Sequence, residues 1–80
     1  MSPLQLKLAR TILGLTVRQA AELSEVSHET IVGIEAGRTS IKEKTRAKVR
    51  VALERAGVIF LDQDNEGPGV RLRKAKGRGK

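Results

Sequence analysis

Catalytic or metal-binding chemistry would need residue types that this sequence scarcely contains. It has no cysteine and a single histidine, His28, which stands beside Glu29. One imidazole cannot build a zinc site alone, and His28-Glu29 by itself is not a catalytic dyad. No phosphate-cradling glycine loop and no evident acidic pair accompanies it. We therefore expect no enzymatic activity, no metal and no cofactor, and no small-molecule ligand is evident.

Positive charge is the chemistry that the sequence does offer. Lys and Arg number 16 against 9 Asp and Glu. The excess is concentrated in residues 71–80, which contain no acid, and in residues 38–50, where Glu43 is the only acid. Two basic segments fit a polyanion such as nucleic acid, although a solvated helix face and a disordered tail would explain the charge equally well. A lone aromatic residue, Phe60, argues against single-strand binding by base stacking.

Helix start and stop signals divide the first part of the chain. Ser2, Thr16 and Ser40 each precede a Gln or Glu by three positions, which predicts a capping box, and Ser27 is a fourth N-cap. The predicted stops are Gly14, Glu25-Val26, Gly37 and Gly57. The predicted helices are therefore residues 3–13, 17–24, 28–36 and 41–56.

Apolar spacing predicts the core and the fold class. The stripes expected to face inward are Leu4, Leu8 and Ile12 with Leu6, Ala9 and Leu13, then Ala20 and Ala21, then Ile31 and Ile34, then Thr45, Val49, Ala52, Leu53 and Ala56. After Gly57, a strand-like run at 58–61, a turn-rich segment and period-two alternation at 70–73 predict a loose hairpin. We expect one mainly α, compact four-helix bundle (1–57), a strand extension (58–73) and a basic disordered tail (74–80).

The second and third predicted helices are separated by almost nothing. Small Ala20 and Ala21 allow close helix approach, and Val26 is expected to fill the gap between two helices held at a steep angle. This arrangement would leave the outer face of helix 28–36 free to enter a major groove.

The segment RTILGLTVRQAAELSEVSHETIVGIEAGR, residues 10–38, resembles the XRE type of helix-turn-helix repressor, the family that includes the phage Cro and CI repressors. The resemblance covers roughly residues 4–55. It implies a lambda-repressor-like fold and sequence-specific binding of double-stranded DNA by a transcriptional regulator, most simply a repressor. It also implies a structural ion pair between Arg10 and Glu35, and a dual role for Thr16 as helix cap and phosphate contact.

The same resemblance implies the DNA contacts. The implied base contacts are His28, Glu29, Thr30, Val32 and Gly33. The implied phosphate contacts are Thr16, Arg18, Ser27, Arg38, Thr39, Ser40, Lys42 and Lys44. For Glu29, a favourable interaction with the helix dipole is the alternative to base contact. We interpret Arg46, Lys48, Arg50 and Arg55 as a solvated helix face.

The two predicted C-terminal strands, residues 58–61 and 70–73, are the basis of a dimer hypothesis. An isolated hairpin is marginal in water, so these strands should cover the helical core or pair with a second chain. The residues proposed for a homodimer on an inverted repeat are Val58, Ile59, Phe60, Leu61, Val70 and Leu72. The alternative function is a helix-turn-helix-derived protein-interaction module, antiactivator or antitoxin-like, that has lost readout. No signal peptide or membrane span is recognisable, so we expect a soluble cytoplasmic protein.

Overall fold

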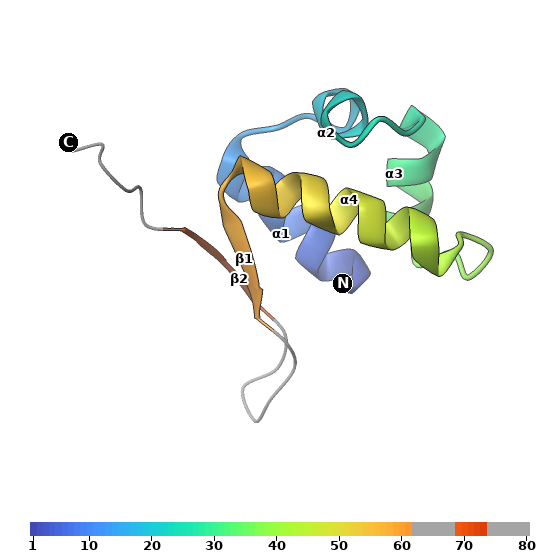
Figure 1. The fold of residues 1–80 in the computed structure, drawn as a ribbon. Helices are drawn as coiled ribbons and strands as arrows, with labels where there is room; N and C mark the ends of the chain where they lie inside the picture. Colours follow the sequence, from blue (N-terminus) through green and yellow to red (C-terminus); the bar gives the residue numbers. More distant parts are fainter. Residues whose placement is uncertain (62–68, 74–80) are drawn as a thin grey trace.

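In the described part of the chain, four helices are followed by a two-stranded antiparallel hairpin (Figure 1). The computed structural model describes residues 1–61 and 69–73. The elements are α1 (Pro3–Leu13), α2 (Val17–Ser24), α3 (His28–Glu35), α4 (Glu43–Ala56), β1 (Val58–Leu61) and β2 (Gly69–Leu72). The mainly α class with a terminal hairpin is therefore confirmed, whereas the predictions for the turn-rich segment and for the tail at 74–80 fall outside the described residues.

The helix ends form where local chemistry places them. Ser2 and Thr16 make complete capping boxes with Gln5 and Gln19, and the Ser27 hydroxyl accepts from the Thr30 N–H. At the other end of α2, Glu25 adopts the left-handed conformation (φ 58°) that glycine usually supplies. These caps confirm the predicted boundaries of α1 and α2 and the predicted start of α3.

The start of α4 differs from the prediction. Its N-cap is Lys42, which makes no side-chain cap hydrogen bond, so the box proposed for Ser40 and Glu43 is wrong. The half-buried Ile41 packs against the core, and the Arg46 guanidinium donates to the carbonyls of Arg38 and Ile41 at 2.7 and 3.3 Å. These contacts anchor residues 38–41 as a loop against the core.

One core lies among the helices and the hairpin. Its buried apolar side chains are Leu6, Ala9, Ala20, Ala21, Ile31, Ile34, Val49, Leu53, Val58 and Phe60. The hairpin therefore shares the helical core, which is the first of its two expected roles. The prediction that Leu4, Leu8 and Ile12 face inward is wrong, because they lie on an exposed side of α1. Thr45 and Ala52 are only half-buried and Ala56 is exposed.

The hairpin is joined to α1 by Gln5. β1 and β2 pair with Val58 opposite Leu72 and Leu61 opposite Gly69. The Gln5 side chain is buried, and its amide nitrogen donates to the carbonyls of Leu61 and Gly69 at 2.8 and 3.0 Å, while its oxygen accepts from the Ser2 N–H at 2.8 Å. A single amide thus caps α1 and fixes both strands at the rung formed by Leu61 and Gly69.

Replacing Gln5 with methionine should destabilise the protein by about 1–3 kcal/mol, because three side-chain hydrogen bonds are lost and two strand carbonyls lose a partner. Urea denaturation would measure the loss. The matched control is Gln19→Met, since Gln19 holds the same place in an exposed capping box and has no bond to a strand. Equal losses in the two variants would contradict the role assigned to the strand contacts.

Candidate nucleic-acid interface

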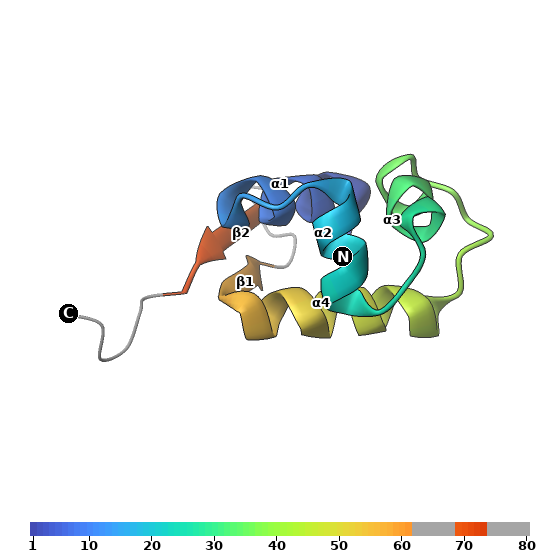
Figure 2. The same ribbon diagram turned by 90° about the horizontal axis from the view of Figure 1, so that it is seen from above.

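The outward face of α3 is uncovered. Figures 1 and 2 both place α3 at the end of the molecule opposite the hairpin. The half-buried Val26 packs against the core in the turn between α2 and α3, as predicted, and Ile31 and Ile34 are fully buried beneath α3. On the opposite side of α3, His28, Glu29 and Val32 are exposed to solvent. A short helix with one buried and one bare face suits insertion into a major groove.

The proposed base contacts are not equally available. His28 and Glu29 are exposed in the first turn, and both side chains are free of hydrogen bonds within the described residues. Thr30 is half-buried, and its hydroxyl lies 2.9 Å from that of Ser27, so the two hydroxyls share one bond at the helix N-terminus. Of the proposed base contacts, His28 and Glu29 are therefore the exposed polar side chains without a partner in the described residues, and Val32 is an exposed apolar one.

Gly33 does not lie on the outward face. It is buried, and a Cβ built on it would stand 2.6 Å from the Ile41 Cδ1 and 3.4 Å from the Arg38 Cδ. The prediction that Gly33 faces DNA is thus wrong. The missing side chain instead lets the loop after α3 pack closely against the helix, a requirement that helical periodicity does not reveal.

Most of the proposed phosphate contacts are exposed near helix starts. They lie at or beside the N-caps of α2 and α3 or in the segment before α4, namely Thr16, Arg18, Ser27, Arg38, Thr39, Ser40 and Lys42. Lys44 differs, because its side chain lines a groove between α2 and α4. Backbone N–H groups at the two helix starts add positive potential to this region.

Two side chains near the candidate interface have surroundings that the sequence did not predict. Gln19 accepts from the Thr16 N–H through its oxygen, and its amide nitrogen has no partner in the described residues. Arg46 was predicted to lie on a solvated face of the last helix, but it is half-buried and its guanidinium binds carbonyls of the loop before α4. The capping-box spacing predicts the position of Gln19. No spacing rule predicts the contacts of Arg46, because its acceptors lie in an irregular loop.

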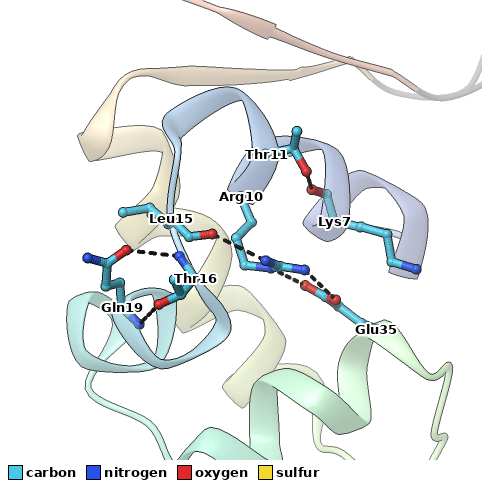
Figure 3. A network of polar contacts seen from close by, with 7 residues as sticks. All are labelled: Lys7, Arg10, Thr11, Leu15, Thr16, Gln19 and Glu35. Atoms are coloured by element: carbon cyan, nitrogen blue, oxygen red, sulfur yellow. Dashed lines mark hydrogen bonds and ion pairs between the residues drawn. The ribbon is translucent and has the colours of Figure 1, made fainter.

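The orientation of α3 is fixed by a bidentate ion pair. Arg10 Nε lies 2.8 Å from Glu35 Oε2 and Arg10 Nη2 lies 3.1 Å from Oε1, while Nη1 donates to the Leu15 carbonyl at 3.2 Å (Figure 3). The Arg10–Glu35 pair expected from the family resemblance is confirmed. It joins α1 to α3 and also holds the loop that leads into α2, so one guanidinium positions both helices of the motif.

The arginine of this ion pair keeps its charge throughout the physiological pH range. Hydrogen bonding to Glu35 raises the pKa of Arg10 above its ordinary value, and the attraction of that carboxylate adds to the effect, whereas burial acts in the opposite direction. A raised pKa in the folded state means that the arginine loses its stabilising charge only as the pH rises through that pKa, far into the alkaline range.

Comparison with known proteins identifies the family. A helix-turn-helix family model, of the XRE type, matches residues 6–53, which is more than half of the 80-residue chain. No curated protein matches the chain. Within the described residues, no helix has the length and apolar character to span a membrane, and no cluster of acidic, histidine or cysteine side chains could hold a metal. The chain belongs to the XRE family of DNA-binding helix-turn-helix proteins.

Proposed function

We propose that this DNA-binding protein is a sequence-specific transcriptional regulator that represses by occupying a promoter, with α3 in the major groove. The observation that supports this most directly is the uncovered outer face of α3 beside two capped helix N-termini. His28 and Glu29 would contact base edges, and the exposed loop 38–42 would contact the backbone of the same half-site. Glu29 is suited to accept from a cytosine amine.

Regulators of this kind read inverted repeats as two-fold dimers, and we propose a homodimer here. Val58 and Phe60 are buried in the core, so the large apolar side chains of the two strands that remain exposed for a second chain are Leu61 and Leu72. A dimer formed here would leave both copies of α3 free.

Selection of bound sites from random duplex DNA would test the function. We expect a palindrome with half-sites about 34–36 Å apart, one helical turn of DNA. Sedimentation at micromolar concentration would test the dimer separately. Equal affinity for selected and random duplexes would contradict the proposal and favour a protein-interaction module in its place.

Replacing Arg38 with alanine should weaken binding to all duplexes almost equally. The Arg38 side chain is exposed and lies against Gly33 of α3, where it can reach a phosphate beside the groove. Losing one phosphate contact should reduce the slope of log affinity against log salt concentration by about 1. Fluorescence anisotropy across a salt series would measure it, and a changed base preference with an unchanged slope would contradict the assignment.

A further inference from the structure

A groove of about 500 Å³ lies between the end of α2 and the outward side of α4, and α3 contributes nothing to its lining. Figure 2 shows α2 running from α1 towards α4, and the groove forms where its last residues reach α4. Its floor includes Leu23 and Val51, which are 44% and 43% exposed, and the small Ala47 and Ala52. These residues would allow another apolar element to approach closely.

The rim of the groove is cationic. Lys44, Lys48 and Arg55 all line it, and Glu25 is the only acidic residue in the described part of the chain that does. Lys48 donates to the Glu25 carbonyl at 3.2 Å, whereas Lys44 and Arg55 make no ion pair or hydrogen bond within the described residues. Lys44, Lys48, Val51 and Arg55 recur at intervals of four, three and four residues, which places them along one side of α4.

A polar group in the same groove also lacks a partner. Ser24 is 2% exposed, and its hydroxyl makes no hydrogen bond in the described part of the chain. Buried hydroxyl groups nearly always have a partner, and that of Ser24 has none among the described residues beside the groove that this residue lines.

We propose that this groove binds an amphipathic helix of a partner protein, one whose apolar stripe is edged by carboxylates. The stripe would pack on Leu23 and Val51, and the carboxylates would meet Lys44, Lys48 and Arg55, in the mode by which helices dock into apolar grooves. A phosphate backbone would match the cationic rim but not the apolar floor, so the chemistry favours protein over nucleic acid. The site is independent of the proposed regulatory function, because the groove and the outer face of α3 use different residues.

The probe is a synthetic helical peptide of 18 or so residues with leucines at helical spacing and glutamates beside them. Titrated into the full chain and followed by amide chemical shifts, it should move the signals of residues 23–25 and 44–55 saturably. Val51→Glu should weaken this binding by at least about tenfold, through loss of an apolar contact and repulsion of the carboxylates. A peptide of the same composition with its leucines scrambled controls for attraction to the basic tail.

The matched control variant is Val32→Glu, which makes the same substitution at a similarly exposed valine of α3 and should leave peptide binding unchanged. Circular dichroism would verify that both variants fold. Three results would overturn the proposal: equal binding of the scrambled peptide, unchanged binding by Val51→Glu, or shifts of these same amides by duplex DNA that Val51→Glu abolishes. The last would assign the groove to nucleic acid, and none depends on whether DNA binding is sequence-specific.

Discussion

Replacing Glu35 with alanine should lower the free energy of unfolding by about 2–4 kcal/mol, between the values typical of exposed and of fully buried ion pairs. The Arg10 and Glu35 side chains are only 20% and 11% exposed, so truncating the carboxylate leaves a largely desolvated guanidinium without its partner. For a domain of this size, in which 1 kcal/mol corresponds to about 4–8 °C, the melting temperature should fall by roughly 8–32 °C. Thermal and urea denaturation would measure both quantities.

The protein contains a natural control for this experiment. Arg50 and Glu54 form a second ion pair on α4, but their side chains are 34% and 35% exposed. Glu54→Ala should therefore cost only about 0–1 kcal/mol. If the two alanine variants lost similar stability, the Arg10–Glu35 pair would be an ordinary surface contact and would not position α3.

A double variant separates the contribution of the Arg10–Glu35 interaction from the cost of leaving one charge unpaired. Arg10→Met combined with Glu35→Leu removes both charges and keeps apolar bulk between α1 and α3. It should be more stable than Glu35→Ala, because no unpaired charge remains in the partly buried site. It should also bind DNA more weakly than its stability alone would indicate, since Arg10 no longer holds the Leu15 carbonyl and α2 can shift relative to α3.

The features that the sequence predicted well are those with a local cause. Capping boxes at Ser2 and Thr16 involve residues three positions apart, so their spacing alone locates the starts of α1 and α2. The same rule failed at Ser40, where the Arg46 guanidinium and the packing of Ile41 keep the chain out of a helix. Tertiary contacts there outweigh a sound local signal.

The core prediction was wrong on α1, where apolar residues form two stripes and only one of them is buried. In α1 the apolar residues cover more than one face, and periodicity cannot decide which face the rest of the protein covers. The deciding residue is polar, because Gln5 faces the hairpin and Leu4, Leu8 and Ile12 are left outside. The burial of Gly33 and the groove between α2 and α4 could not be predicted from the sequence either, because both depend on how separate segments pack together.

The candidate site was predictable only through the family resemblance. Periodicity alone indicates that Ile31 and Ile34 face inward, and hence which side of α3 is bare. The prediction that these exposed residues contact bases comes from the XRE resemblance. The residue types alone do not require it, because the position of His28 and Glu29 at a helix start can also be explained by electrostatic interaction with the helix dipole. The fold and the match over residues 6–53 establish the family, while the contacts of individual residues stay predictions.

Val32→Glu is the most stringent test of the proposed contacts between α3 and DNA. Val32 is 38% exposed on the outward face of α3, so the substitution should change stability by no more than about 0.5 kcal/mol. In a complex, however, the new carboxylate would stand in a groove bordered by phosphates. We expect affinity for the selected operator to fall at least about 100-fold, equivalent to about 2.7 kcal/mol. Gel-shift or anisotropy titration would measure the change.

The control is again the other exposed valine. Val51→Glu changes the net charge of the protein by the same amount, but on α4 and at a similar exposure of 43%. Any loss of affinity that both variants share comes from the general attraction between a cationic protein and DNA, which acts over the whole surface. The additional loss in Val32→Glu reports on α3 alone. If the two variants bound the operator equally, α3 would not enter the major groove, and DNA binding would have to use another face of the protein.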